Sequence, residues 1–257
     1  MPESLTLPDP IWQNGLMFLA AVLKNRPETL TVTELFYMPD VLIQGQAGRL
    51  EGKYSPAGAP DAPIALILHP HPLHGGTMNN KICYSLYHSY VRQGFATLRF
   101  NYRGVGKSQG SWGEVEGELA DASAALQWLQ MYNPNASEIW VAGFSFGAYL
   151  AMQLLMRRPE IDSFMCVAPP ANIFDFNFLA PCPSSGLIVQ GEKDQVVPQT
   201  SVDKLVQKLN LQKDISIDYR IVPGAGHFFG EQLDQLEGHV DDYLAKWYQP
   251  EAIALAS

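Results

Sequence analysis

The segment 143–147, with the sequence Gly-Phe-Ser-Phe-Gly, constrains the fold of this chain more than any other stretch. The apolar run 139–142 leads into it and the apolar segment 148–156 leads out at helical spacing, so the sequence predicts a strand, a sharp turn and a helix. Glycines on either side of Ser145 let strand and helix pass close together while the serine holds a strained backbone. The turn is therefore expected to lift the Ser145 hydroxyl clear of a sheet, beside a helix N-terminus that favours developing negative charge.

The rest of the chain alternates short apolar runs with amphipathic stretches. Strands are predicted near 41–43, 50–54, 64–68, 96–100, 139–142, 163–168, 187–190 and 215–222, and helices near 81–93, 118–131, 148–156, 201–209 and 231–247. The segment 30–55 alternates in short apolar stretches broken by glycines, which favours antiparallel strands, whereas continuous apolar runs such as 64–68 are typical of buried parallel strands. We therefore predict an α/β fold, a doubly wound and mostly parallel sheet with helices on both faces.

The length of 257 residues fits one α/β domain. We predict a helical extension over 1–29 packed on the domain, a single domain over 30–248 and a frayed tail over 249–257. The apolar run 15–23 is too short to span a bilayer, and Glu3 and Asp9 precede it with no Lys or Arg. This arrangement favours the packed helix over a signal peptide.

The charge balance is acidic, with 17 basic against 26 acidic residues and a net charge of −9. Basic residues are scattered, so we expect neither nucleic acid nor a membrane as a partner. We expect a small-molecule substrate instead. The three cysteines, Cys83, Cys166 and Cys182, are odd in number and have the spacing of neither a metal knuckle nor a disulfide framework. We interpret them as free thiols of a reducing compartment, which predicts a cytoplasmic location.

A serine hydroxyl is a poor nucleophile at neutral pH and needs a base that is oriented by an acid. Asp194 lies in the turn after the apolar strand 187–190, and His227 lies in the loop after the last strand. We assign Ser145 as the nucleophile, His227 as general base and acid, and Asp194 as the carboxylate that orients the imidazole. Glu192 is the alternative acid, while His239 falls inside the last predicted helix and is discounted as the base.

Stabilising an oxyanion requires backbone N–H groups close to the nucleophile. The N–H of Phe146 follows the serine, and a second donor should come from the loop 69–76, whose sequence is His-Pro-His-Pro-Leu-His-Gly-Gly. Proline has no N–H, so His71 is the first candidate and Leu73 the second. The three histidines of this loop also suggest a metal site, but no carboxylate lies nearby and the prolines restrict how the rings could converge, so no metal is expected.

The segment 103–108 imitates a phosphate-binding loop. The full motif requires a glycine five residues before Gly106, and Asn101 occupies that position. We therefore interpret its glycines as a turn after the strand 96–100 and expect no nucleotide.

Taken together, the turn 143–147, the segment 101–108 and the placement of the candidate acid and base resemble the α/β-hydrolase superfamily over roughly 64–243. The sequences His-Pro-His-Pro at 69–72 and Gly-Gly-Thr-Met-Asn-Asn at 75–80 are similar to a group of small bacterial hydrolases. Many relatives in the superfamily have His-Gly where this chain has His-Pro. The resemblance implies the α/β-hydrolase fold, a serine hydrolase with no cofactor, and cleavage of an ester, thioester or amide through an acyl-enzyme.

Relatives with a lid domain usually carry it after the sixth strand, where this chain has only 169–185. No separate lid fits there, so we expect an open site suited to short acyl groups or to the exposed end of a larger substrate. Leu73 and the loop residues Phe174, Phe176 and Phe178 are candidates for substrate binding, although these three rings would equally serve as core. A carboxylic ester is the leading substrate class; a peptidase, an acyltransferase and a non-catalytic binding module are the alternatives.

Overall fold

The computed structural model describes residues 40–248. The predicted helical extension over 1–29 and the predicted tail over 249–257 lie outside the described residues. Within 40–248, no helix is long and apolar enough to cross a membrane.

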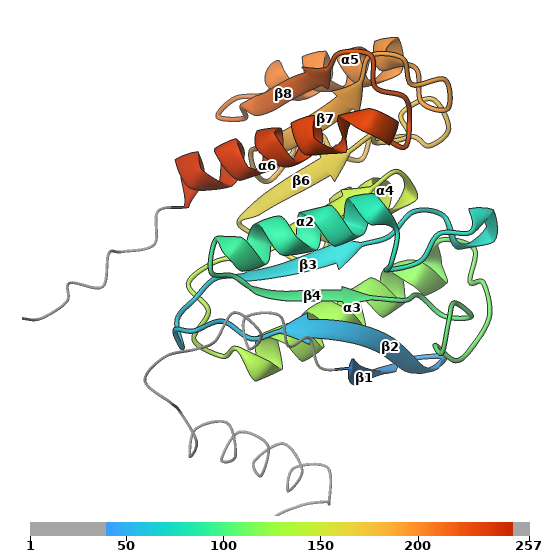
Figure 1. Cartoon of the computed structure of the whole chain (residues 1–257), viewed down its shortest axis with the longest axis vertical. Helices are drawn as coiled ribbons and strands as arrows, with labels where there is room; N and C mark the ends of the chain where they lie inside the picture. The colour runs from blue at the N-terminus through green and yellow to red at the C-terminus, as the bar shows by residue number, and fades with distance from the viewer. Residues whose placement is uncertain (1–39, 249–257) are drawn as a thin grey trace, which may run out of the picture. The chain divides into compact units, whose positions relative to one another are not determined.

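One eight-stranded sheet forms the centre of the described chain (Figure 1). The strands are β1 (Asp40–Gly45), β2 (Gly48–Ser55), β3 (Ile64–Leu68), β4 (Ala96–Phe100), β5 (Ile139–Phe144), β6 (Ser163–Val167), β7 (Gly186–Gly191) and β8 (Ile217–Val222). They are arranged in the order β1-β2-β4-β3-β5-β6-β7-β8. The β1–β2 and β2–β4 pairs are antiparallel and all others are parallel, which confirms the predicted mostly parallel sheet.

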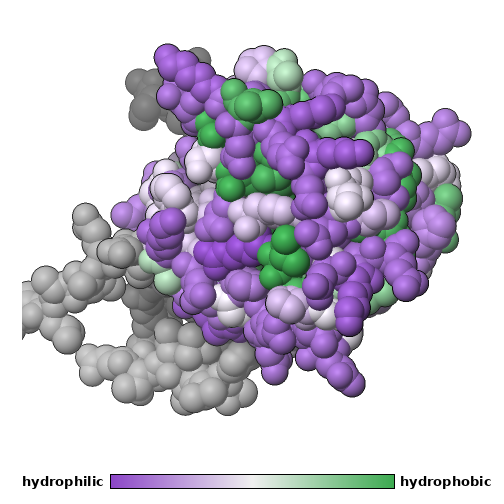
Figure 2. Space-filling model, turned by 90° about the horizontal axis from the view of Figure 1, so that it is seen from above, coloured by the Kyte–Doolittle hydropathy of each residue, from purple (hydrophilic) through white to green (hydrophobic). Residues whose placement is uncertain are grey.

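Helices cover both faces of this sheet, as the alternating pattern predicts (Figure 1). They are α2 (Lys81–Arg92), α3 (Glu116–Tyr132), α4 (Phe146–Leu155), α5 (Gln199–Asn210) and α6 (Leu233–Trp247), with short 3-10 helices η2 (Pro72–His74) and η3 (Gly230–Gln232). Helices α2 and α6 bury their apolar sides on one face, and α3, α4 and α5 on the other. Figure 2 shows that hydrophobic residues reach the surface as separate patches among hydrophilic ones.

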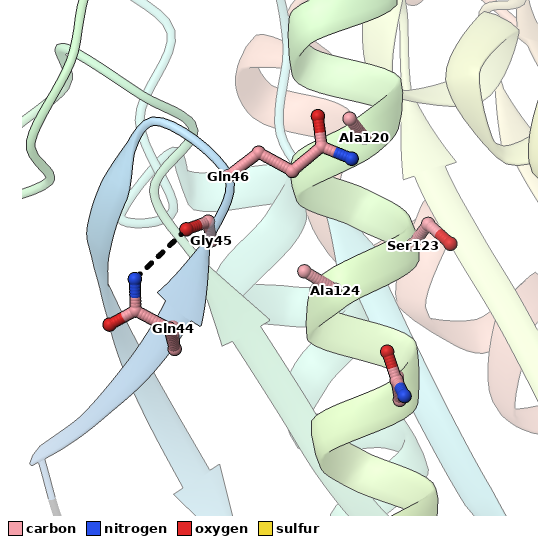
Figure 3. A pocket seen from close by; sticks show the side chains of 7 residues that line it. Gln44, Gly45, Gln46, Ala120, Ser123 and Ala124 are labelled. Carbon is pink, nitrogen blue, oxygen red and sulfur yellow. Dashed lines mark hydrogen bonds between the residues drawn. The ribbon is translucent and has the colours of Figure 1, made fainter.

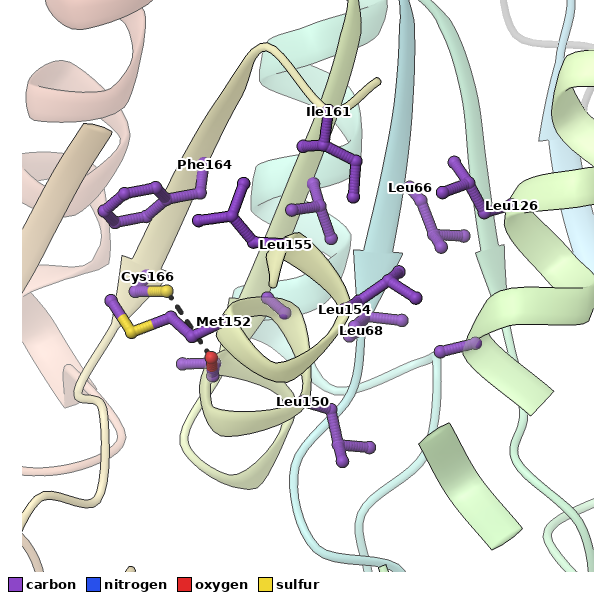
Figure 4. Close-up of a cluster of buried hydrophobic side chains, with 14 of the residues drawn as sticks. Leu66, Leu68, Leu126, Leu150, Met152, Leu154, Leu155, Ile161, Phe164 and Cys166 are labelled. Carbon is purple, nitrogen blue, oxygen red and sulfur yellow. Dashed lines mark hydrogen bonds between the residues drawn. The ribbon is translucent and has the colours of Figure 1, made fainter. Parts of the chain in front are cut away.

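Helix α4 is the centre of the larger hydrophobic core. Its side chains meet leucines of β3 and residues of α3 and β6 in a fully buried cluster; Figure 4 labels Leu66, Leu68, Leu126, Leu150, Met152, Leu154, Leu155, Phe164 and Cys166. The three cysteines are all free and buried. Burial raises the pKa of the Cys83 thiol to about 12, so this group stays an unreactive thiol at neutral pH.

The turn between β5 and α4 explains both glycines of the 143–147 segment. A Cβ on Gly143 would lie 2.3 Å from the carbonyl carbon of Gly147, and one on Gly147 would lie 2.2 Å from the carbonyl oxygen of Leu68. Helix α4 therefore approaches β3 and β5 more closely than any residue with a side chain would permit.

We expect Gly147→Ala to lower the free energy of unfolding by about 1–3 kcal/mol or more, because the added methyl group meets backbone rather than a movable side chain. Urea unfolding measures this change. Gly238→Ala in α6 is the matched control: in the described chain nothing lies within 4 Å of its added Cβ, so a gain of roughly 0.5–1 kcal/mol is expected. Equal effects of the two substitutions would contradict the steric explanation.

The connection from β6 to β7 spans 168–185 and contains neither helix nor strand. A separate lid domain is therefore absent from the described chain, as the sequence predicts. Within residues 40–248, no inserted domain therefore covers the carboxyl edge of the parallel strands, where Ser145 lies.

Candidate active site

Ser145 lies at the top of the turn after β5, as the first residue before α4. Its backbone has φ 54° and ψ −118°, a conformation that is strained for a residue with a side chain. The Ser145 N–H donates to the carbonyl of Val167 at 2.8 Å, which ties the turn to the end of β6. The side chain is half-buried at a helix N-terminus, where negative charge is favoured.

His227 lies between Ser145 and Asp194. Its Nε2 is 3.2 Å from Ser145 Oγ, and its Nδ1 is 2.7 Å from Asp194 Oδ2. A carboxylate only accepts hydrogen bonds, so Nδ1 carries the proton and Nε2 is left to accept from the serine. The structure thus brings together the three residues that the sequence nominates as nucleophile, base and acid.

The Asp194 carboxylate is held by several donors besides the imidazole. Its Oδ1 accepts from the N–H groups of Val196 and Val197 at 2.9 and 2.8 Å, and its Oδ2 accepts from Gln190 Nε2 at 3.2 Å. Both Asp194 and His227 are buried. Because these bonds hold the carboxylate in one position, its bond to Nδ1 also holds the imidazole ring of His227 in one orientation.

The two alternative residues have other roles. Glu192 Oε2 accepts the N–H of Gly224 at 2.7 Å, so this carboxylate braces the loop after β8 and does not face the imidazole. His239 lies in the middle of α6, where its carbonyl oxygen accepts from Arg220 Nη1.

Two supporting residues were not predicted from the sequence. Gln190 is fully buried at the end of β7 and contacts Asp194, and the Phe144 ring lies 5.0 Å from the His227 ring. The signal for Gln190 was present, because a glutamine at the end of the apolar run 187–189 has to find a partner when it is buried. Phe144 gave no such signal, since its position in β5 suits an ordinary core residue.

Two backbone N–H groups are available for an oxyanion. Phe146 begins α4, and His71 precedes η2; within residues 40–248 neither N–H has a backbone or side-chain acceptor. The Leu73 N–H, in contrast, donates to His71 Nδ1 at 3.2 Å. The structure therefore favours His71 over Leu73 as the second donor.

The His71 ring is held between two aromatic side chains. Its centroid lies 4.7 Å from both the Trp112 and the Phe146 rings. Trp112 comes from the β4–α3 connection, whose residues Glu114 and Val115 have positive φ. This contact fixes the loop after β3 against the first residue of α4, where both candidate donors lie.

We expect His71→Pro to lower kcat by about 10²–10³-fold relative to His71→Ala, because proline removes one oxyanion donor and alanine retains it. The φ of His71 is −54°, close to the value that proline imposes. Both variants lose the ring, so the difference between them isolates the N–H. Steady-state kinetics with an activated ester measures it, and equal kcat values would instead point to another donor.

The three histidines of the 69–76 loop do not converge on a metal site. His69 is fully buried, with Nδ1 2.7 Å from the Pro70 carbonyl oxygen and Nε2 3.2 Å from the Tyr102 N–H. Both ring nitrogens are thus engaged. No group of three or more His, Cys, Asp or Glu side chains within 40–248 could hold a metal ion.

Burial lowers the pKa of His69 to about 3. As pH falls from about 6.5 toward 3, the unfolded chain takes up a proton that folded His69 does not, so the free energy of unfolding decreases by up to about 1.4 kcal/mol per pH unit. We expect His69→Gln, which cannot titrate, to weaken this dependence, while His74→Gln, at an exposed ring, leaves it in place. Urea unfolding between pH 4 and 7 tests this, and equal slopes for His69→Gln and the wild type would contradict it.

The predicted substrate-binding side chains separate into two groups. Phe176 is buried in the core cluster, and Phe178 packs against that cluster at 6.0 Å from the Phe176 ring, so these two favour the alternative of a core role. Phe174 lies 5.9 Å from the Phe146 ring, and Leu73 is exposed. Phe174 also packs against the core cluster, but its ring reaches Phe146, the residue after the nucleophile.

A separate surface pocket lies between the β1–β2 turn and α3 (Figure 3). Strand β1 is at the edge of the sheet, separated from β5 by β2, β4 and β3. The pocket is lined by amide, hydroxyl and small side chains: Gln44, Gly45, Gln46, Ala120, Ser123, Ala124 and Gln127. None of these side chains titrates, so the pocket offers no acid or base.

The fold and the serine on its strained turn define the chain as an α/β-hydrolase of the serine hydrolase class. The family model of the X-Pro dipeptidyl-peptidases (S15 family) matches residues 53–215, and the chain belongs to that family.

Individual relatives include two α/β-hydrolases and one uncharacterised protein. The chain is similar to an α/β-hydrolase of unknown function from Agrobacterium tumefaciens, with 55% identity, a TM-score of 0.79 and coverage of 81% of this chain and 95% of the other. An α/β serine hydrolase homologue from Coxiella burnetii has 35% identity and a TM-score of 0.72 over 85% and 100% of the two chains. An uncharacterised protein of Rickettsia prowazekii is 51% identical over 80% of this chain and 89% of its own.

Proposed function

We propose that the protein hydrolyses carboxylic esters or thioesters through an acyl-enzyme on Ser145. The observation that carries this proposal is the hydrogen-bonded series from Asp194 through His227 to Ser145, with contacts of 2.7 and 3.2 Å. The uncommitted N–H groups of Phe146 and His71 support it, because they can bind the charge that develops on the substrate oxygen.

In the proposed reaction, Ser145 Oγ attacks the ester carbonyl while His227 Nε2 takes the hydroxyl proton. The two N–H groups stabilise the tetrahedral oxyanion, and Asp194 stabilises the imidazolium. The bond to the leaving alcohol then breaks as His227 returns the proton to its oxygen. Water, deprotonated by His227, attacks the acyl-enzyme and releases the carboxylic acid and free Ser145.

The family match raises a peptidase as the second candidate. A dipeptidyl peptidase must bind the free ammonium group of a peptide, which calls for a carboxylate directed at the substrate. Three carboxylates of the described loops accept hydrogen bonds within the protein: Asp194 from His227, Glu192 from the Gly224 N–H, and Asp175 from the Asn177 N–H at 2.9 Å. These bonds leave the three groups less suited to binding an ammonium group, which favours the ester.

Parallel assays separate the two candidates. We expect turnover of p-nitrophenyl butyrate that is lost in Ser145→Ala, and no turnover of glycyl-prolyl-p-nitroanilide. A higher kcat/KM for the anilide than for the ester would overturn the ester proposal in favour of the peptidase. Absence of both activities in a folded protein would overturn it as well.

A further inference from the structure

Four large hydrophobic side chains are exposed on the loops that surround Ser145. They are Leu73, Ile173, Val196 and Phe228, with exposed fractions of 66%, 61%, 48% and 56%. They follow β3, β6, β7 and β8 respectively, and Ser145 follows β5. Because these parallel strands end at one edge in the order β3-β5-β6-β7-β8, the four loops lie on both sides of the nucleophile.

Each of the four residues contacts a residue of the site, through its side chain or its backbone, or neighbours one in the chain. Phe228 lies with its ring 5.0 Å from the His227 ring, and the Val196 N–H donates to Asp194 Oδ1. The Leu73 N–H donates to His71 Nδ1. Ile173 precedes Phe174, whose ring contacts Phe146.

Hydrogen bonds hold these loops in place. The Ile173 N–H donates to the Pro170 carbonyl at 3.0 Å, and Asn172 Nδ2 donates to the Val196 carbonyl at 3.0 Å, which joins two of the loops. These bonds fix the backbone at Ile173 and Val196, two of the four exposed positions. Exposed hydrophobic groups gathered around a reactive centre are typical of a binding site.

We propose that Leu73, Ile173, Val196 and Phe228 form an apolar rim that binds the alkyl chain of a medium-length acyl group bound to Ser145. This inference rests on the proposed ester hydrolysis and names its substrate class. The rim side chains offer no hydrogen-bond donors or charges, which suits an alkyl chain. The net charge of −9 disfavours an anionic surface as the occupant.

Chain-length selectivity tests the rim. In the wild type, kcat/KM should rise from the acetyl to the octanoyl p-nitrophenyl ester, since each buried methylene contributes up to roughly fourfold. We expect the double variant Ile173→Ser/Val196→Ser to lower the ratio of kcat/KM for the octanoyl ester to kcat/KM for the acetyl ester about tenfold, because it removes two alkyl contacts. Backbone hydrogen bonds of both residues survive the change.

Leu211→Ser is the matched control. Leu211 is 87% exposed at the end of α5, ahead of β8, and therefore at the opposite edge of the sheet. Its octanoyl-to-acetyl ratio should equal that of the wild type. An unchanged ratio in the double variant, or an equal loss in Leu211→Ser, would overturn the rim.

A binding measurement keeps this test separate from catalysis. Ser145→Ala protein is titrated with methyl octanoate, with and without the two rim substitutions, and Kd is expected to rise about tenfold with them. An unchanged Kd overturns the rim even if esters are hydrolysed. If the wild type hydrolyses no ester but the two rim substitutions still raise the Kd for methyl octanoate, the proposed function is overturned and the rim is supported. A wild-type dimer that dissociates in the double variant would show instead that the rim joins two copies of the chain.

Discussion

Replacing Ser145 with alanine is expected to lower kcat for ester hydrolysis by about 10⁴–10⁶-fold, the scale seen when a triad nucleophile is lost. The reason is geometric, because Ser145 Oγ is the atom that faces His227 Nε2 at 3.2 Å. Alanine removes that atom and leaves the turn 143–147 intact. Initial rates with p-nitrophenyl butyrate measure the loss, and thermal unfolding should show a folded protein.

Ser201→Ala in α5 is the matched control for this substitution. The Ser201 hydroxyl donates to the Pro198 carbonyl at 2.7 Å and takes no part in the triad, so its kcat should equal that of the wild type. A fluorophosphonate probe provides a second readout. Labelling that persists in Ser145→Ala would show that another residue is the nucleophile.

Replacing Asp194 with asparagine is expected to lower kcat about 10⁴-fold. The carboxylate can only accept from His227 Nδ1, which leaves Nε2 unprotonated toward the serine. An asparagine amide can donate to Nδ1 instead, and the proton then lies on Nε2, where it prevents the ring from accepting the serine proton.

Glu192→Gln distinguishes this orienting role from a general effect of removing one negative charge from the loop after β7. Glu192 accepts the Gly224 N–H, which glutamine can still do. We expect its kcat to fall less than tenfold, in line with a structural side chain. If Glu192→Gln lost more activity than Asp194→Asn, the acid of the triad would be Glu192.

The sheet and the candidate triad were predictable from the sequence because both depend on local patterns. Apolar runs indicated the strands, and the two glycines of the 143–147 segment indicated a turn at which strand and helix pack closely. Asp194 and His227 could be nominated because each follows a predicted strand at the edge where Ser145 lies. The shared edge predicted that the three residues lie close together, but the choice of Asp194 over Glu192 required the hydrogen bonds of the structure.

Side-chain environments were less predictable, because they depend on contacts between distant segments. The phenylalanine pattern at 174–178 did not reveal that Phe176 is buried and Phe174 reaches Phe146. The choice between His71 and Leu73 depended on one bond from the Leu73 N–H to an imidazole. The exposure of Ile173 and Phe228 likewise results from how their loops are held.

The short β6–β7 connection has a consequence for kinetics. Enzymes whose sites close under a mobile segment can be limited by opening and product release. Since the described β6–β7 connection carries no such domain over the carboxyl edge of this sheet, turnover should follow acylation or deacylation, and solvent viscosity should affect kcat little. The same openness keeps bulk water beside the acylated serine, so hydrolysis should prevail over transfer to a dilute alcohol.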